Sequence, residues 1–223
     1  MSQPTEQSIQ PPEILARGPW ELDRVRARWV YEPYQPSPAQ TEAADAAIRS
    51  LRERGSPSHD GLAARLVSFE VDGNSLKLEL QPIRWALRLL PDAGASISVL
   101  CVVRDAAGSW LAGRRASWVA SWAGRWALGA GGSVEVDENP ADTLGRELEE
   151  EWSVTPERLQ VEALVRLANG MVMLIGQAWL PDGASVQPDA EHDAFAWWPP
   201  EVERWPAEAD APLRLVGSML AHS

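Results

Sequence analysis

The chain has 223 residues, of which 45% are hydrophobic, so it is long enough to bury a good core in one large domain or two small ones. Its net charge of -12 and its pI near 4.7 argue against a protein that binds the phosphate backbone of nucleic acid polymers. No apolar run approaches about 18 residues and the chain has no basic and apolar start, so we expect neither a membrane helix nor a signal peptide. The only cysteine, Cys101, lies in the apolar run SISVLCVV. We expect a buried free thiol in a soluble, cytoplasmic protein.

The N-terminal part of the chain carries no motif that indicates a function. Residues 1–12 are polar and rich in proline, so we expect them to be disordered. An apolar patch with Trp20, Trp29 and Tyr31 follows, and it would support a homodimer if it were exposed. A scaffold or dimer-forming role is the first hypothesis for this part, and a contribution to the pocket of the following domain is the second.

Residues 13–94 are expected to form an accessory α+β region. Apolar residues recur at helical spacing in its first half, and alternating apolar and polar residues surround the turn Asp72-Gly73-Asn74 in its second half. These patterns predict a helix at 41–54, a hairpin of 66–71 and 76–80, a strand or short helix at 85–90, and a boundary turn at 91–94.

From residue 95 onward the pattern changes to short strands and two helices. One of the turns between strands is the hairpin signal Ala168-Asn169-Gly170. The predicted strands are 96–104, 109–114, 125–128, 159–167, 171–180 and 195–198, and a closing helix is predicted at 213–220. Residues 95–223 are therefore expected to form one domain.

A second helix is predicted to begin at Asn139-Pro140, since Asn is a good N-cap and Pro suits the first helical position. Its residues Ala141, Leu144, Leu148 and Trp152 form one apolar face, and Glu147, Glu150 and Glu151 project from an adjacent face. Like charges at this spacing destabilise a helix, and a divalent cation would remove the repulsion. The alternative interpretation is a solvated acidic face.

The same stretch resembles the Nudix box, a family signature of fixed glycine, glutamate and arginine positions. It is matched by Gly132, Glu138, Arg146, Glu147, Leu148, Glu150, Glu151 and Val154. Ser153 replaces the late glycine of the signature, so it either adopts a strained left-handed conformation, at a cost of about 1–2 kcal/mol, or the helix ends differently. The loop before the box has Gly129-Ala130 where many members have a single proline, and its path is left open.

The resemblance implies a Nudix-type α/β/α sandwich with a mixed sheet, preceded by the smaller β-containing N-terminal region. It also implies a pyrophosphohydrolase that uses Mg²⁺ or Mn²⁺ to cut the phosphoanhydride of a small nucleoside diphosphate derivative, such as a nucleotide sugar, a dinucleotide or a modified nucleotide. The expected partner is thus a small-molecule nucleotide. The alternative is a Nudix-fold regulatory module that binds a nucleotide without turnover.

Residue by residue, the resemblance implies a metal site made of the Gly131 carbonyl, Glu147, Glu150 and Glu151. Glu147 and Glu150 are also assigned to catalysis, and Glu147 would help to activate water. Arg146 is expected to point away from the acidic face and to pair with Glu138, which ties the loop to the helix.

Several residues outside the box are candidates for catalysis or substrate binding, and each also has a structural interpretation. Glu191 is our choice for a further catalytic acid, against a polar loop that enters a strand. His192 has the right titration range for proton transfer, but an exposed loop residue is the expected interpretation. Arg114, Arg115 and Arg125 flank the loop before the box and can bind phosphates, although surface ion pairs are an equal alternative. Trp122 can stack on a base or sugar, as can Trp118, but core packing is the more frequent role of a tryptophan.

Overall fold

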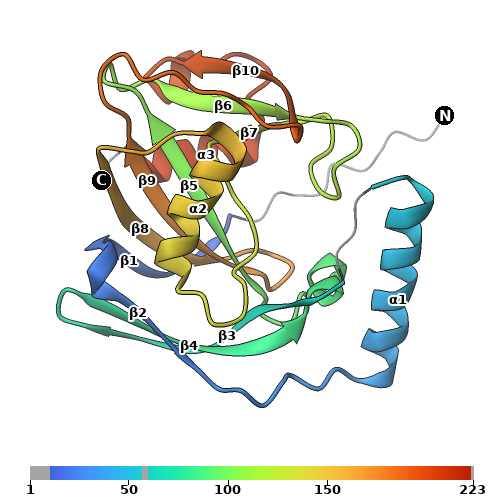
Figure 1. Ribbon diagram of the computed structural model, residues 1–223. Helices are drawn as coiled ribbons and strands as arrows, with labels where there is room; N and C mark the ends of the chain where they lie inside the picture. Colours follow the sequence, from blue (N-terminus) through green and yellow to red (C-terminus); the bar gives the residue numbers. More distant parts are fainter. Residues whose placement is uncertain (1–10, 57–59, 222–223) are drawn as a thin grey trace.

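The computed structural model describes residues 11–56 and 60–221 of the chain, and the disorder expected for 1–12 falls almost wholly outside them. In this described part a seven-stranded mixed sheet has the order β1-β8-β9-β5-β6-β10, and β7 pairs with β6 (Figure 1). Strands β5 and β9 are parallel, and the other neighbours are antiparallel. The strands are β1 (Glu13–Glu21), β5 (Ile97–Arg104), β6 (Trp110–Arg115), β7 (Trp126–Leu128), β8 (Arg158–Arg166), β9 (Val172–Trp179) and β10 (His192–Trp198).

A smaller sheet of three strands lies beside the large one, in the order β2-β4-β3. It comprises β2 (Val25–Trp29), β3 (Leu62–Asp72) and β4 (Ser75–Arg84). Strands β3 and β4 form the predicted hairpin, and Gly73 at its tip has a φ of +57°, which suits glycine. The expected hairpin is therefore confirmed, with strands longer than the alternating pattern indicated.

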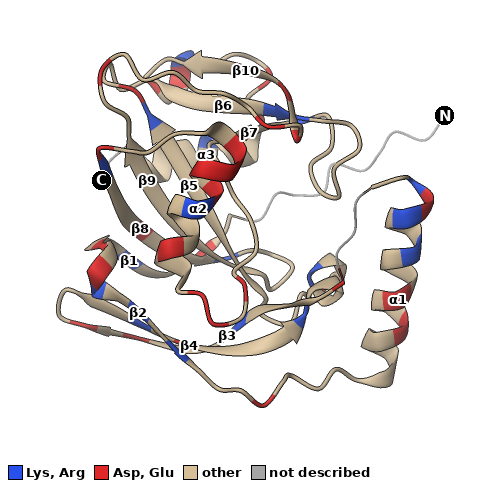
Figure 2. Ribbon diagram, viewed as in Figure 1, with Lys and Arg blue, Asp and Glu red and all other residues tan. Residues whose placement is uncertain are grey.

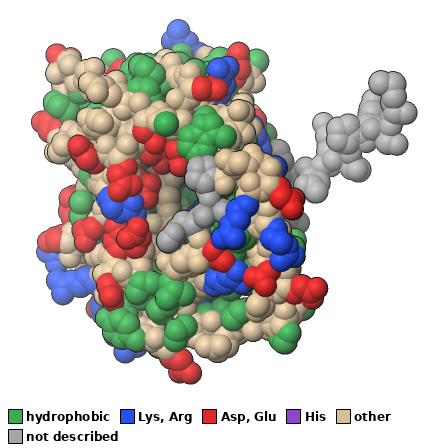
Figure 3. Space-filling view, turned by 45° about the vertical axis from the view of Figure 1, so that its right-hand side comes forward, with side chains coloured by type: hydrophobic (Ala, Val, Ile, Leu, Met, Phe, Trp, Pro, Cys, Tyr) green, Lys and Arg blue, Asp and Glu red, His purple; other side chains and the backbone are tan. Residues whose placement is uncertain are grey.

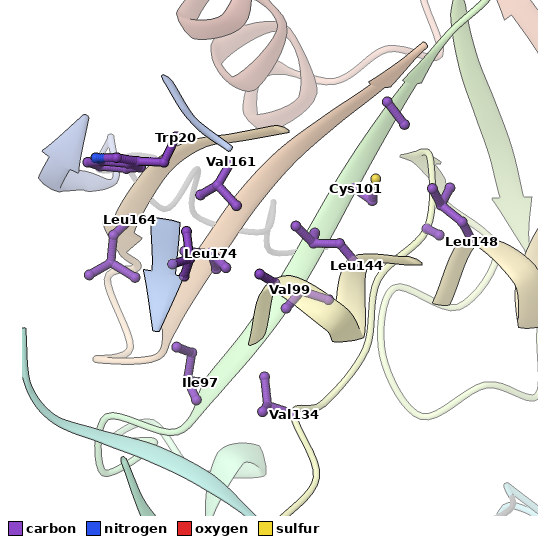
Figure 4. Packing of buried hydrophobic residues seen from close by; sticks show 14 of the residues in the cluster. Trp20, Ile97, Val99, Cys101, Val134, Leu144, Leu148, Val161, Leu164 and Leu174 are labelled. Atoms are coloured by element: carbon purple, nitrogen blue, oxygen red, sulfur yellow. The ribbon is translucent and has the colours of Figure 1, made fainter. Parts of the chain in front are cut away.

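Two helices cover opposite faces of the large sheet, as expected for an α/β/α sandwich. These are α2 (Pro140–Trp152) and α3 (Ala211–Leu220). Leu144 and Leu148 of α2 pack on Val99 and Cys101 of β5 in one core cluster, and Figure 4 shows these side chains facing one another. Leu213 of α3 belongs to the cluster on the other face. Burying such a leucine contributes about 1.5–3 kcal/mol, so both helices are fixed to the sheet mainly by apolar packing.

The expectation for Cys101 is confirmed, since its thiol is free and fully buried. Burial raises the pKa of this thiol far above its usual range, which leaves it unreactive. Among the described residues, no helix has the length and hydropathy that crossing a bilayer requires.

Helix α1 (Pro38–Glu53) begins three residues earlier than the predicted helix. Pro38 occupies the first turn, where a proline loses no hydrogen bond. Ser37 and Gln40 form a reciprocal capping box, in which each side chain accepts from the other residue's backbone N–H. Residues 85–90, for which a strand and a short helix were both open, form the 3-10 helix η2 (Trp85–Leu89), and the remaining 3-10 turns are η1 (Leu22–Arg24) and η3 (Val202–Arg204).

The N-terminal residues are integrated into the large sheet. Strand β1 pairs with β8 along its length, from Glu13 beside Arg166 to Glu21 beside Gln160. Trp20 is only 2% exposed and belongs to the main core cluster, so it is not part of an exposed apolar patch, whereas Tyr31 is 68% exposed. The sequence around a tryptophan on an edge strand does not show whether the side chain faces solvent or a core. For Trp20, the pairing of β1 with β8 determines that it is buried.

Candidate active site

The site is built where the loop before α2 runs along β5. The backbone N–H of Val99 donates to the Gly132 carbonyl over 2.9 Å, and that of Cys101 donates to the Ala130 carbonyl over 2.8 Å. A Cβ on Gly131 would lie 2.7 Å from the Val99 carbonyl oxygen, and a Cβ on Gly132 would collide with the carboxylate of Glu147. The glycine pair is therefore required by close approach of the loop to β5 and to α2.

Glu147 and Glu151 of α2 are both buried beside this loop, with 7% and 5% of their surface exposed. Oε1 of Glu151 accepts from the Gly131 backbone N–H over 3.3 Å. Burial raises the pKa of Glu147 to about 7, although the neighbouring Arg146 opposes that shift. Burial, and then the charge of Glu147, raise the pKa of Glu151 to about 9. Two acids that resist ionisation thus lie together at the glycine loop.

Arg146 links the acidic side chains of α2 to the preceding loop. It donates to both carboxylate oxygens of Glu138, over 2.8 Å and 3.2 Å, and to the Ser133 carbonyl over 3.2 Å. The predicted tie between loop and helix is present. Arg146 does not point away from the acidic face, however, because its Nη1 also lies 2.9 Å from Glu147 and 3.0 Å from Glu150. Figure 2 shows the acidic segments of α2 on either side of this basic one.

The donor set at α2 fits a hard divalent cation in part. Oε2 of Glu151 is buried and has no hydrogen-bond partner among the described residues, which is the condition that an oxygen-seeking cation would relieve. Glu147 lies beside it, but the half-exposed Glu150 is turned towards Arg146. Within residues 11–56 and 60–221, no three acidic, His or Cys side chains are gathered closely enough to hold a metal ion. Glu150 would have to leave Arg146 to complete a site of three carboxylates.

A cavity of about 440 Å³ opens at the glycine loop. Gly131, Gly132 and Glu151 form part of its wall, and Arg88 and Arg115 bring two cations to it. The rest of the wall is mainly apolar and includes Leu167, Met171, Met173, Leu213, Val216 and Trp122. In Figure 3 acidic side chains gather on the left of the molecule, on the side where Figure 1 places α2. The arrangement combines an apolar wall with a few charged groups, as is typical of pockets for small organic ligands.

Comparison with known proteins agrees with this geometry. The model of the NUDIX domain matches residues 95–215, which is more than half of the chain. The chain belongs to the Nudix family. The α/β fold expected from the Nudix box is therefore confirmed, and so is membership of a family of pyrophosphohydrolases.

Several solved structures resemble parts of this Nudix protein. A MutT protein from Methanosarcina mazei Go1 is 27% identical, with 51% of this chain and 86% of that chain covered and a TM-score of 0.40. A MutT NUDIX hydrolase from Burkholderia pseudomallei is 23% identical, covering 56% and 97% with a TM-score of 0.46. The NUDIX domain of Shewanella oneidensis NrtR, crystallised with ADP ribose, is 22% identical, covering 57% and 88% with a TM-score of 0.45. A comparison with curated protein sequences finds no match.

The substrate-binding candidates divide between the Nudix cavity and the surface. Trp122 lines the cavity and is 41% exposed. Arg114 is half-exposed, donates to Asp193 over 2.6 Å and is not part of the cavity wall in the described residues. Arg125 donates to Asp210 and lies over the Trp122 ring, 4.4 Å from its centroid, also outside the wall. For both arginines the structure shows the alternative, a surface ion pair.

Glu191 and His192 lie at the start of β10, close to the acidic end of α2. Glu191 accepts from Arg115 over 2.8 Å, so it is held beside the cavity by one of the cavity's own cations. His192 was expected to be exposed, and this is wrong: its side chain is buried against Trp152, with ring centroids 4.6 Å apart. Its Nε2 lies 3.8 Å from Oε2 of Glu151. Desolvation lowers the pKa of His192 despite its contact with Asp189.

Sequence reasoning missed Arg88 altogether. Residues 85–90 were read only as a strand or short helix, and they lie outside the Nudix box and outside the matched domain. The available signal was weak: a single arginine flanked by leucines in WALRLL. Its position in the cavity wall depends on how η2 packs against the glycine loop, which no local pattern reveals.

Proposed function

We propose that this protein is a metal-dependent hydrolase that cleaves the phosphoanhydride bond of a small nucleoside diphosphate derivative, such as a nucleotide sugar, a dinucleotide or a modified nucleotide. The observation that carries this proposal is the pair of buried carboxylates, Glu147 and Glu151, beside the glycine loop, where Glu151 also lines the cavity. Burying two acids together is unfavourable without a compensating cation, so the arrangement supports metal binding more than a purely structural role.

In this proposal Glu147, Glu150, Glu151 and the Gly131 carbonyl hold Mg²⁺ or Mn²⁺. A metal ion held there would neutralise charge on the pyrophosphate and would lower the pKa of a water molecule. The water oxygen then bonds to phosphorus, the anhydride P–O bond breaks, and the leaving group departs as a phosphate ester. We assign the proton of that water to a carboxylate of the site, Glu147 or the more exposed Glu191.

The cavity supports a small substrate. Its volume of about 440 Å³ lies in the range of pockets for small organic ligands, and the protein's net charge of -12 disfavours nucleic acid polymers. Trp122 at the wall offers a ring on which a base or sugar can stack, and Arg115 offers a cation for a phosphate oxygen.

The proposal is tested by a turnover assay on a panel of UDP-sugars, ADP-ribose, NADH, dinucleoside polyphosphates and nucleoside triphosphates with Mg²⁺ or Mn²⁺. We expect at least one compound to be cut, and we expect Glu151→Gln to lower kcat by at least about 100-fold, the scale of losing one group that stabilises the transition state. The matched control is Glu149→Gln, which makes the same charge change at an exposed position of α2. Loss of activity in both variants would contradict a specific role for Glu151.

A second candidate function is a Nudix-fold module that binds a nucleotide without cutting it. The observation that favours it is the ion pair of Glu150 with Arg146, which keeps three carboxylates from gathering. This candidate predicts that no panel compound is cut while one or more of them raises the melting temperature of the protein. The hydrolase proposal predicts turnover by the same preparation.

A further inference from the structure

Arg88 enters the cavity from the segment that precedes the matched Nudix domain. Helix α1 packs through Ala44, Ile48 and Leu51 against η2, where Ala86 and Leu87 complete the same apolar cluster. Burial of this cluster fixes η2, and η2 in turn fixes the Cα of Arg88 at the cavity wall. Packing within the N-terminal segment therefore fixes the position of Arg88 at the site.

The side chain of Arg88 is anchored to the glycine loop. Its Nη1 donates to the hydroxyl of Ser133, the residue that follows Gly131 and Gly132. The same hydroxyl accepts from Nε1 of Trp85 over 3.1 Å, and the Arg88 guanidinium lies 5.5 Å from the centroid of the Trp85 ring. Two residues of η2 thus bind one hydroxyl of the loop that also approaches Glu147 and Glu151.

Arg88 differs from the other arginines around the site in its lack of a carboxylate partner. Arg115 pairs with Glu191 and Arg146 pairs with Glu138. In the described residues Arg88 makes no ion pair within 4.0 Å, and its one hydrogen bond uses a single N–H of the five that a guanidinium carries. Desolvation lowers the pKa of Arg88, which shows that its charge is poorly solvated, while the nearby charge of Glu147 partly offsets that effect.

We propose that Arg88 binds a phosphate group of the substrate, so that the N-terminal segment completes the active site of the Nudix domain. The inference rests on the proposed function, because it takes the ligand of the cavity to be a diphosphate. A guanidinium with free donors at a cavity wall matches the paired oxygens of a phosphate group. Arg115, which lines the same cavity, supplies a second cation for the same diphosphate.

The competing explanation is that Arg88 only balances the charge of Glu147. The two explanations differ in what removal of the arginine does to ligand binding. If Arg88 only balances the charge of Glu147, its loss changes the stability of the metal-free protein. A bound diphosphate would then be repelled less only if the acids became protonated. A phosphate-binding arginine contributes directly to diphosphate affinity, and its loss weakens that affinity while the fold is retained.

The test is calorimetric binding of methylenediphosphonate, a pyrophosphate analogue that is not hydrolysed, to the full-length protein with Mg²⁺. We expect Arg88→Gln to raise the dissociation constant at least about 10-fold, and Arg88→Lys, which keeps the charge but not the paired donors, to raise it less. Arg49→Gln is the matched control, since Arg49 is exposed on α1 of the same segment and its loss changes the charge equally. That control is expected to bind like the unmodified protein.

Equal affinity of the folded Arg88→Gln variant and the unmodified protein would overturn the inference, and so would an unmodified protein that does not bind the analogue. If circular dichroism shows that Arg88→Gln does not fold, the test uses Arg88→Lys instead. An Arg88→Lys variant with unchanged affinity for the analogue and unchanged KM would then overturn the inference. Turnover with an unchanged KM in Arg88→Gln would remove this role and leave the proposed hydrolase standing. If binding of the analogue depends on Arg88 but no panel compound is cut, the phosphate-binding role of Arg88 stands and the proposed hydrolase falls.

Discussion

At the scale of single residues, Ser153 decides how helix α2 ends. It stands where the Nudix signature has glycine, and the structure gives it φ 52° and ψ 43°, the left-handed conformation. Its backbone N–H still donates to the Glu149 carbonyl over 3.0 Å, so the helix keeps its usual end. Of the two outcomes that the sequence left open, a strained left-handed cap is the one observed.

Ser153→Gly is expected to stabilise the protein by about 0.5–1 kcal/mol. Glycine removes a left-handed penalty of about 1–2 kcal/mol and loses part of that gain through the greater freedom of its unfolded chain. Urea denaturation measures the change, with an unaltered m-value. Ser153→Ala serves as the control and should show no gain, because alanine keeps the Cβ. A glycine variant no more stable than the alanine variant would show that the serine is unstrained.

The candidate site could be predicted only where it depends on local spacing. The shared face of Glu147 and Glu151 follows from positions along one helix, and the pair of Glu138 with Arg146 was implied by the resemblance to the Nudix box. Arg88 and His192 owe their positions to packing between distant segments. Nothing in the residues next to them distinguishes a buried, functional side chain from an exposed one.

At the scale of elements, α2 carries two acids whose pKa values rise on folding. The ordinary value is 4.5, and burial raises the pKa of Glu147 to about 7 and that of Glu151 to about 9. Between pH 4.5 and these raised pKa values, the two carboxyl groups hold more protons in the folded protein than in the unfolded chain. Their stabilising contribution is therefore complete below about pH 4.5 and is lost as the pH rises through 7 and 9.

In the presence of a chelator, we expect the free energy of unfolding to fall between pH 5 and pH 9. Glu151→Gln cannot ionise, so its decline should flatten above pH 7, while Glu149→Gln should decline like the unmodified protein. Urea denaturation across this range measures the effect. A flat profile for the unmodified protein, or equal slopes for both variants, would mean that burial does not hold Glu151 in its protonated form.

Most helices and strands lie within a few residues of their predicted positions because their apolar periodicity reflects the faces that they bury. The start of α1 was predicted at residue 41, three residues after Pro38, although proline is favoured at the first helical position. The form of η2 was left open because a six-residue apolar run fits a strand or a helix equally. Its role then followed from packing against α1.

At the scale of the whole molecule, the turn at 91–94 does not separate two independent sheets. Strand β1 pairs with β8 of the Nudix domain, and the ion pair between Glu13 and Arg166, at 2.7 Å, joins the same two strands. Trp20 of β1 is buried in the core that also contains Leu144 of α2. Pairing between segments so far apart in the chain leaves no local signature, which is why the sequence did not place β1 in the large sheet.

The measurement that tests the central claim most directly is the rate of cleavage of the best panel compound as a function of Mg²⁺ concentration, starting from protein treated with a chelator. We predict no turnover without metal and saturation on its addition. We also predict a half-maximal Mg²⁺ concentration at least about 10-fold higher in Glu151→Gln, and unchanged in Glu149→Gln, since Glu151 lies buried at the glycine loop and Glu149 is exposed. Full activity in the chelator, or the same metal dependence in all three proteins, would contradict the assignment of α2 as the metal-binding helix.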